Sequence, residues 1–372
     1  MAGYEKVFIN DISKEVIEKG IGWMMNNPET GLKKLESDGK LGQGSTYKGL
    51  LERLIKETDL KKAVENADFV IEAVPEVMEI KKDVYKLLGE YTSKDTVLAS
   101  NTSSMSITKL GEASGKPEKV IGMHFFSPVR NELIEITKGD KTSNESMDIG
   151  VAVGETLPAT EGKRVIITLE KETPGHIANR VVGAIGPYYN WIFDQALEKN
   201  IPFEQIDADT NDFGGLGICA MIDGIGVDTV YNVMKYFEET LSPDFAPSQT
   251  LVNLVESGNL GLKTGKGFYD WVQGALPERD LSKKAGLVDF EIFLAQQLNE
   301  GCRLLEQGIV KNYKVIDKAV NIGYRMPGPF IMNKNNYEKL SKKLEEVADL
   351  TGKNYLRPCK LMKSGEFLKM RK

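Results

Sequence analysis

Short runs of β-branched, aliphatic and aromatic residues recur through the first half of the chain, separated by helical or turn-forming stretches. Apolar runs of this kind are typical of strands that are buried on both faces, as in a mostly parallel sheet covered by helices. The pattern therefore predicts an α/β domain. We expect its strands at residues 7–11, 68–74, 96–101, 120–126, 132–137 and 164–170.

The long stretch between the first two of these runs has a helical pattern instead. It covers about residues 14–57 and is interrupted by the polar, glycine-rich sequence ESDGKLGQGS at 36–45. Glycine and polar residues clustered between periodic segments predict a turn. We therefore expect a helical hairpin, or arm, inserted into the α/β domain.

The second half of the chain has helical periodicity. The change falls at Thr173-Pro174-Gly175, where a proline suited to the first turn of a helix predicts a domain boundary. A polar stretch at 273–286 predicts another boundary. Beyond it, apolar residues three and four apart predict one amphipathic helix; they are Leu287, Phe290, Leu294, Leu298, Cys302, Leu305 and Ile309.

The helical sections on either side of the second boundary resemble each other. Residues 196–207 (ALEKNIPFEQID) are similar to residues 304–317 (LLEQGIVKNYKVID), and a glycine-containing turn follows each. An internal repeat explains this similarity, and chance likeness between helical segments is the alternative. The predicted fold is an α/β domain at 1–173, followed by two duplicated all-α domains at 174–272 and 285–372.

Composition narrows the class of protein. The chain has 372 residues, of which 41% are hydrophobic and 27% charged, as expected for a globular protein with more than one domain. Its net charge is −6 with acidic and basic residues evenly mixed, which argues against non-specific nucleic-acid binding. Cys219, Cys302 and Cys359 lie far apart, which argues against a disulfide framework or a zinc site. Since no long apolar stretch and no signal-peptide pattern occur, we expect a cytoplasmic protein with no membrane partner.

Of the two histidines in the chain, His124 has the stronger case for catalysis. It closes the strand predicted at 120–126, and ligands bind at the carboxyl ends of strands in open parallel sheets. Glu135 follows after a tight return and is expected beside the imidazole, where a carboxylate fixes the tautomer and raises the basicity. The alternative is a structural histidine. A cluster of hydroxyl and amide groups at 100–108, SNTSSMSIT, is suited to holding a substrate oxygen.

His176 and Asn179 lie near the predicted start of the first helix after the boundary. We expect His176 to be a partly exposed residue without a catalytic role. For the amide of Asn179, a hydrogen bond within the helix start and a functional role fit equally well. The functional role is either binding a substrate carbonyl or ordering the histidine.

Asp11 directly follows the first predicted strand. In dinucleotide-binding folds, a carboxylate at the end of the second strand accepts hydrogen bonds from the adenosine ribose, which favours NAD over NADP. Helix capping is the alternative, because IND-IS is also a helix-start pattern. Since no glycine-rich loop precedes Asp11, the sequence predicts an N-terminally incomplete Rossmann-like domain. The first strand lies centrally in the usual order, so we expect two facing sheet edges to be unpaired.

Glu76, Lys81 and Lys263 are further candidates for cofactor contacts. Glu76 and Lys81 follow the strand predicted at 68–74, where a strand-to-helix turn borders the cofactor in doubly wound folds. For both, a solvated helix charge is the alternative. Lys263 lies in the glycine-rich turn KTGKGFYDW, which is either a packed chain reversal or a turn from which the lysine reaches the cofactor.

Six segments of the chain, in this order, closely resemble the 3-hydroxyacyl-CoA dehydrogenases, including the 3-hydroxybutyryl-CoA dehydrogenases. They are DFVIEAVPE, LASNTSSMSIT, GMHFFSPV, LIEIT, TPGHIANR and LKTGKGFYDW, and the similarity covers nearly the whole chain. The resemblance implies an NAD-dependent oxidoreductase of fatty acid β-oxidation. Such an enzyme converts an (S)-3-hydroxyacyl-CoA, for example 3-hydroxybutyryl-CoA, to the 3-oxoacyl-CoA.

The resemblance also implies roles for individual residues. His124 corresponds to the catalytic base and Glu135 to its paired carboxylate, with Glu132 as the competing choice. Ser103 and Asn179 correspond to residues around the reacting oxygen of the substrate. The implied NAD contacts are Asp11, Glu76, Lys81, Ser103, Ser127 and Lys263, and the implied partners of the CoA phosphates are Lys33, Lys34 and Lys40.

Departures from the family pattern leave alternatives open. MPGPF at 326–330 occurs in the second helical section, whereas the family usually has a similar sequence in the first. We therefore expect either a homodimer or a monomer whose second repeat replaces a partner. Because the glycine loop is absent, a redox-inactive protein that binds CoA thioesters is the alternative to an enzyme, and a related hydroxyacid or sugar-acid dehydrogenase is another. For an active enzyme, we expect a late start or a lost N-terminus.

Overall fold

The computed structural model describes residues 3–28, 30–42, 44–126, 131–159, 162–210 and 216–370. The chain divides into two compact units. The first contains the chain up to His176 together with Ile322–Arg325, and the second contains Ile177–Asn321 and the chain from Met326 onward. The units are described separately below.

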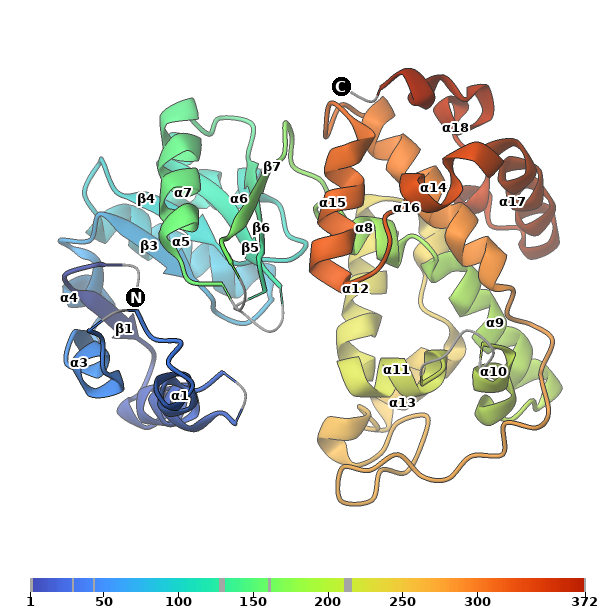
Figure 1. The fold of residues 1–372 in the computed structure, drawn as a ribbon, viewed down its shortest axis with the longest axis horizontal. Helices are drawn as coiled ribbons and strands as arrows, with labels where there is room; N and C mark the ends of the chain where they lie inside the picture. The colour runs from blue at the N-terminus through green and yellow to red at the C-terminus, as the bar shows by residue number, and fades with distance from the viewer. Residues whose placement is uncertain are drawn as a thin grey trace. The chain divides into compact units, whose positions relative to one another are not determined.

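The first unit is built on parallel strands (Figure 1). Its larger sheet has the order β3-β4-β5-β6-β7, in which β6 runs antiparallel to β5 and the other pairs are parallel. The smaller sheet is the parallel pair β1-β2. The strands are β1 Val7–Asn10, β2 Leu54–Glu57, β3 Phe69–Glu72, β4 Val97–Ser100, β5 Val120–Phe125, β6 Leu133–Lys138 and β7 Val165–Thr168.

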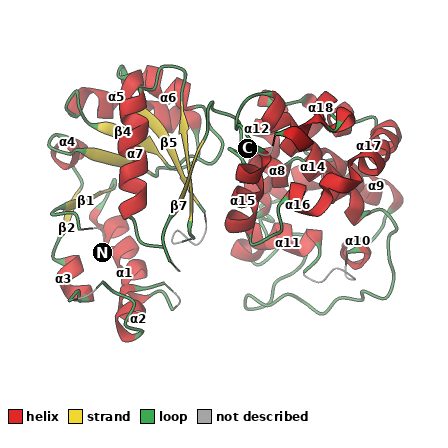
Figure 2. Ribbon diagram, turned by 45° about the horizontal axis from the view of Figure 1, so that its top comes forward, coloured by secondary structure: helices red, strands yellow, loops and turns green. Residues whose placement is uncertain are grey.

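Helices cover both faces of the larger sheet (Figure 2). Because successive strand residues point to opposite faces, Leu98 packs beneath α5 and α6 while its neighbours Val97 and Ala99 pack beneath α7. All three are at most 1% exposed. The helices concerned are α5 Met78–Tyr91, α6 Ile107–Ser114 and α7 Asn144–Thr156. The α/β domain predicted from the apolar runs is therefore present, and strands occur within all the predicted runs.

The smaller sheet differs from the prediction. The arm expected over about 14–57 contains helices α1 Lys14–Asn26, α2 Leu32–Ser37 and α3 Tyr47–Leu51, but its last residues form β2. The expectation of helix at Leu54–Glu57 is therefore wrong. The strand β1 is also less buried than its apolar run predicts, with Val7 and Phe8 exposed by 39% and 41%.

The sheets β1-β2 and β3–β7 are separate. Within the described residues, β1 pairs only with β2 and β3 pairs only with β4, so each leaves one edge unpaired, as the sequence predicts. Ile71 in β3 is 42% exposed. Asp11, Glu76 and Ser103 follow the carboxyl ends of β1, β3 and β4. Because β3 and β4 pair in parallel, their carboxyl ends lie at the same edge of the larger sheet.

The second unit is helical (Figure 1). The apolar stripe predicted from Leu287 to Ile309 falls on α14 from Phe290 to Leu305, while Leu287 precedes this helix and Ile309 follows it. Its helices are α8 Ala178–Gly183, α9 Gly186–Lys199, α10 Phe203–Asp209, α11 Ile218–Ile225, α12 Val227–Thr240, α13 Gln249–Glu256, α14 Phe290–Glu306, α15 Tyr313–Tyr324, α16 Pro329–Asn333, α17 Tyr337–Thr351 and α18 Lys360–Ser364. The helix α4 Leu60–Val64 belongs to the first unit.

Two buried aspartates make corresponding contacts in the two similar helical sections. Asp207 accepts hydrogen bonds from the backbone N–H groups of Cys219 and Ala220, at the start of α11. Asp317 likewise accepts from Phe330 and Ile331, at the start of α16. A carboxylate at a helix N-terminus satisfies free N–H groups and favours the helix dipole. The shared contact favours an internal repeat over chance similarity.

A glycine accompanies each of these aspartates. A Cβ added at Gly217 would lie 2.4 Å from the Cγ of Asp207, and one added at Gly328 would lie 2.3 Å from Oδ1 of Asp317. No real Cβ makes such contacts, so both positions require glycine. The match of aspartate, glycine and helix start in both sections is the strongest structural support for the proposed repeat.

Candidate active site

His124 and Glu135 face each other on the neighbouring strands β5 and β6. The antiparallel register places them directly opposite one another, which brings residues 11 positions apart in the sequence into contact. Nδ1 of His124 lies 3.1 Å from Oε2 of Glu135, and the residues are 5% and 0% exposed. Because a carboxylate only accepts hydrogen bonds, Nδ1 carries the proton and Nε2 is left with a free lone pair.

The structure distinguishes Glu135 from its competitor Glu132. Glu132 precedes β6, and its Oε2 lies 2.8 Å from Nη2 of Arg325. Arg325 belongs to the short segment Ile322–Arg325, which contains the last residues of α15 but lies in the first unit. Glu135, and not Glu132, is therefore the carboxylate opposite His124.

Two further rings surround the imidazole of His124. The ring of Phe126 lies edge-on at a centroid distance of 4.5 Å, and the ring of His176 stacks on it at 5.0 Å with an interplanar angle of 25°. Tyr324 in turn lies edge-on to Phe126 at 6.0 Å. These contacts hold the plane of the His124 ring, which a base needs in order to point its lone pair at one proton.

The expectation of a partly exposed His176 is wrong. Its residue is 2% exposed and its Nε2 lies 3.0 Å from the carbonyl oxygen of Thr102. Its φ of 51° is unusual for a residue other than glycine. The turn before α8 bends the chain inward at this residue instead of starting the helix, so the imidazole enters the core of the first unit.

The hydroxyl cluster predicted after β4 is held by carboxylates. Thr102 Oγ1 donates to Oε1 of Glu76 at 2.5 Å, and the same oxygen accepts from the backbone N–H of Ser103 at 3.0 Å. Ser103 is half-buried, and the described residues offer its hydroxyl no hydrogen-bond partner. Its hydroxyl is therefore available to a ligand, next to the turn that His176 contacts.

Glu172 fixes the other end of this hydroxyl cluster. Its carboxylate accepts from the hydroxyl of Ser106 and from the backbone N–H groups of Ile107 and Thr108, at 2.6–3.1 Å. These groups form the first turn of α6, whose free N–H groups need acceptors. The turn between β4 and α6 is thus tied to the segment that leads to His176.

Lys81 lies in a buried ion pair. Its residue is 1% exposed, and Nζ lies 2.8 Å from Oε1 of Glu72, 3.2 Å from Oε2 of Glu76 and 3.2 Å from the carbonyl of Val74. Three acceptors satisfy the three protons of an ammonium group. Ser100 donates to the other oxygen of Glu72 at 2.7 Å. The buried Lys81 therefore holds the carboxylate of Glu76 in place, while the side chain of Glu76 stays 39% exposed.

The remaining candidates share no contact with this cluster that the structure describes. Asp11 is exposed beyond the end of β1, and its Oδ1 accepts from the backbone N–H of Ile12 at 2.7 Å. Ser13, and not Asp11, caps α1 by accepting from the N–H of Val16. Ser127 lies outside the described residues. Asn179 and Lys263 belong to the second unit, where Lys263 pairs with Asp228 at 2.5 Å.

The lysines of the helical arm make local contacts. Nζ of Lys33 donates to the side chain of Asn26 at 2.8 Å, and Nζ of Lys34 pairs with Asp38 at 2.7 Å. Lys40 is exposed. An ion pair as exposed as that of Lys34 and Asp38 contributes little to the stability of the protein.

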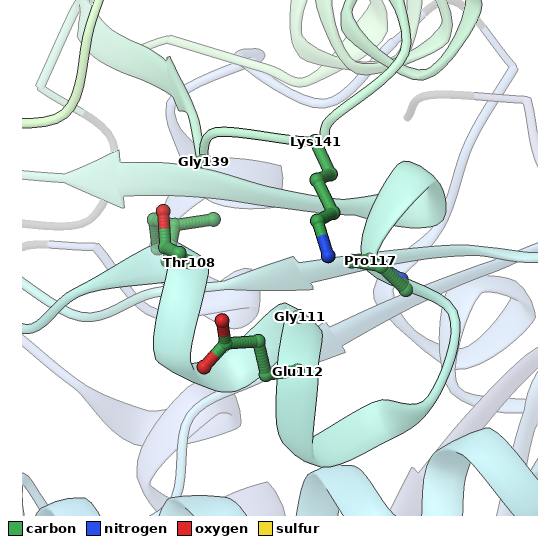
Figure 3. A pocket seen from close by; sticks show the side chains of 7 residues that line it. Thr108, Gly111, Glu112, Pro117, Gly139 and Lys141 are labelled. Atoms are coloured by element: carbon green, nitrogen blue, oxygen red, sulfur yellow. The ribbon is translucent and has the colours of Figure 1, made fainter.

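A small hollow lies beside the first turns of α6 (Figure 3). Thr108, Glu112 and Lys141 are among the side chains around it, and its empty volume is about 200 Å³. It shares no residue with the His124 cluster. Within the described residues, no group of histidine, cysteine or carboxylate side chains is arranged to hold a metal ion.

Comparisons with known proteins match both units. The model for the NAD-binding domain of 3-hydroxyacyl-CoA dehydrogenases matches residues 1–170, and the model for their C-terminal domain matches residues 175–271. The chain belongs to the 3-hydroxyacyl-CoA dehydrogenase family. This family membership places it among NAD-dependent oxidoreductases, as the sequence predicts.

Individual relatives of this dehydrogenase family support the assignment. A probable 3-hydroxybutyryl-CoA dehydrogenase from Deinococcus radiodurans is 34% identical over 270 residues, which cover 71% of this chain and 91% of that protein. The fatty acid oxidation complex subunit alpha of Vibrio campbellii is 32% identical over 319 residues, covering 80% of this chain. The matched region is 44% of that subunit, so the chain spans less than half of its length.

Solved structures of the family share this fold. The crystal structure of 3-hydroxybutyryl-CoA dehydrogenase from Escherichia coli K12 has a TM-score of 0.77 at 25% identity, covering 99% of this chain and 94% of that one. The (S)-3-hydroxybutyryl-CoA dehydrogenase from Ralstonia eutropha has a TM-score of 0.60 at 29% identity, covering 72% and 91%. No helix among the described residues is both long and apolar enough to cross a membrane.

Proposed function

We propose that this protein oxidises (S)-3-hydroxyacyl-CoA thioesters, such as 3-hydroxybutyryl-CoA, to 3-oxoacyl-CoA with NAD, using His124 and Glu135 as its acid–base pair. The observation that supports this most directly is the His124–Glu135 contact at the end of β5, beside the turn that carries Ser103. A histidine with a free Nε2 and a carboxylate on Nδ1 is suited to removing a hydroxyl proton near neutral pH.

In this mechanism His124 acts first as a base. Nε2 takes the proton of the C3 hydroxyl, and the imidazolium that forms is stabilised by the charge of Glu135, 3.1 Å from Nδ1. The hydroxyl of Ser103 donates to the same substrate oxygen and orients it. Bound NAD would supply the acceptor for the hydride that leaves C3. In the reverse direction protonated His124 returns its proton to the carbonyl oxygen.

Residues of the first unit fit parts of the cofactor. Asp11 presents an exposed carboxylate at the carboxyl end of β1, the position from which an acidic residue accepts hydrogen bonds from the adenosine ribose. Glu76 keeps a partly exposed carboxylate beside Ser103. We propose that these two residues contact NAD, with Lys81 positioning Glu76, and that Ser127 and Lys263 complete the contacts.

The proposed CoA contacts are Lys33, Lys34 and Lys40, whose ammonium groups lie on or next to α2. Their protein partners are neutral or exposed, so a CoA phosphate would compete for them. Asn179 is proposed to lie, with Ser103, around the reacting oxygen of the substrate.

The test is acetoacetyl-CoA reduction by NADH, followed at the nicotinamide absorbance, together with direct titration of NADH binding. We expect turnover that His124→Ala reduces by about 10²–10⁴-fold while NADH binding is retained. Glu112→Gln, an exposed change on α6, is the control that leaves turnover unchanged. Binding of the thioester without any turnover would instead support a redox-inactive protein, and turnover that survives His124→Ala would contradict the assignment of the base.

A further inference from the structure

The mechanism proposed above does not use His176, although this residue lies against its base. We propose that His176 is a positioning residue of the same site: a second imidazole that fixes the ring of His124 and the Thr102–Ser103 turn relative to each other. The proposal rests on the proposed function and identifies one more residue on which that function depends.

The hydrogen bond to Thr102 sets the tautomer of His176. A carbonyl oxygen only accepts, so Nε2 of His176, 3.0 Å from the carbonyl oxygen of Thr102, carries the proton. Nδ1 of His176 is then an acceptor, and it is buried with no partner among the described residues. His124 has the opposite tautomer, because its Nδ1 donates to Glu135. The two stacked rings therefore carry their protons on different nitrogens.

His176 and Glu76 hold the same residue from two sides. Thr102 is 0% exposed; its carbonyl accepts from His176, and its hydroxyl donates to Glu76. The backbone N–H of Ser103 also donates to Glu76. Together these contacts fix the direction of the peptide that leads into Ser103. Since His176 also stacks on His124, it links the proposed base to the proposed oxygen-binding hydroxyl.

The conformation of His176 supports a role beyond packing. Its φ of 51° is one that β-carbon-bearing residues avoid, and glycine would adopt it without strain. The chain nevertheless places an imidazole there and buries a nitrogen without a partner, which also costs free energy. Both costs are offset only if this side chain makes contacts that glycine or an apolar residue cannot make.

Burial favours the neutral form of His176. The groups that face it are His124 on β5, Glu135 on β6, and Glu76 and the carbonyl of Thr102 in the loops above the sheet. Burial, and next the neighbouring His124, lower the pKa of His176, and the carboxylates oppose them only in part. When His124 takes the substrate proton, the ring stacked on it therefore stays uncharged and does not repel the imidazolium.

The first test reads the two rings directly. The chain has two histidines, so a protein labelled with ¹⁵N-histidine gives two imidazole spin systems, and His176→Gln assigns them. We expect the Nε2–H tautomer for His176 and the Nδ1–H tautomer for His124. An Nδ1–H tautomer for His176 would overturn the proposal. This measurement needs no substrate, so it stands even if acetoacetyl-CoA is not reduced.

The second test separates the two contacts of His176. His176→Gln keeps a side-chain N–H of similar reach for the Thr102 carbonyl but loses the ring, whereas His176→Phe keeps a ring against His124 but loses the donor. We expect His176→Phe to lower kcat about tenfold with little change in KM, and His176→Gln to lower it only about threefold. Thermal unfolding and NADH binding show whether each variant is folded. A folded His176→Phe variant with wild-type kcat would overturn the proposal.

Discussion

At the scale of single residues, the relation between His124 and Glu135 could be predicted from the sequence, while the place of His176 could not. His124 lies near the end of one apolar run and Glu135 lies within the next, and antiparallel pairing of the two strands brings them together. His176 follows Thr-Pro-Gly, a pattern that also starts helices. Only the positive φ values of Gly175 and His176 turn its side chain inward, and no sequence pattern fixes them.

Replacement of Glu135 tests the carboxylate alone. Glu135→Gln keeps the shape and a hydrogen-bond acceptor for Nδ1 of His124 but removes the charge that stabilises the imidazolium. We expect kcat for acetoacetyl-CoA reduction to fall roughly 10- to 100-fold, since the imidazolium loses its counter-charge. Glu132→Gln, on the residue paired with Arg325, is the matched control and should leave kcat unchanged.

The burial of His176 predicts how stability depends on pH. In the folded protein, the pKa of His176 is below the ordinary value of 6.5. Between these two pKa values, the unfolded chain therefore binds more protons than the folded protein. The stability contributed by neutral His176 is therefore present above about pH 6.5 and is lost as the pH falls below it. Urea unfolding between pH 5 and pH 8, roughly the range in which histidine titrates, should show this fall, and His176→Gln should reduce the slope. An unchanged slope in that variant would show that other groups cause it.

At the scale of elements, apolar runs predicted β3 to β7 well, because strands buried on both faces have a simple pattern. The strand β2 was missed because its four residues, LIKE, contain two charges and directly follow a helical segment, so no buried run marks it. Lys81 shows a related limit: its charge resembles an exposed helix charge in the sequence, yet the strand–helix packing of β3 on α5 buries it.

The buried pair of Lys81 and Glu72 joins α5 to β3. Lys81→Met leaves Glu72 without its partner in a site that is 1% exposed, and loss of one member of a buried pair costs about 3–5 kcal/mol. The neighbouring Lys82, which pairs with Glu79 at the surface, is the matched control, and Lys82→Met should cost less than about 1 kcal/mol. The measurement is the free energy of unfolding in urea. Equal effects of the two changes would show that the buried pair does not join the elements.

The two sheets should also differ in stability. Leu98, Ile121 and Ile134 in the larger sheet are 0% exposed, whereas β1 pairs on one side and its Val7 and Phe8 are about two-fifths exposed. Local opening needs less free energy where few apolar contacts are lost. We expect backbone amides of β1 and β2 to exchange with deuterium roughly 100-fold faster than those of β4 and β5. Similar rates in both sheets would mean that they open together.

At the scale of the whole molecule, the chain does not divide into sequential blocks as the sequence predicts. The segment Ile322–Arg325 contains the last residues of α15 but belongs to the first unit, where Arg325 pairs with Glu132 and Tyr324 lies against Phe126. Periodicity describes one helix at a time and cannot reveal a contact between segments almost 200 residues apart. The surroundings of His124 therefore depend on Ile322–Arg325, a segment far from His124 in the sequence.

Gly323 offers a test of that dependence. A Cβ at this position would lie 2.9 Å from Cε1 of Phe126, the ring that packs edge-on against His124. We expect Gly323→Ala to displace this ring and lower kcat several-fold, on the order of 10-fold, although the residue is far from His124 in the sequence. The matched control is Gly224→Ala on α11, where an added Cβ meets nothing within 4 Å. Because alanine favours helix over glycine, the control should be as stable as the parent protein or more so. If both variants kept full kcat, the ring of Phe126 would not be needed to hold His124, and the contribution of Ile322–Arg325 to the site would be limited to the ion pair of Arg325.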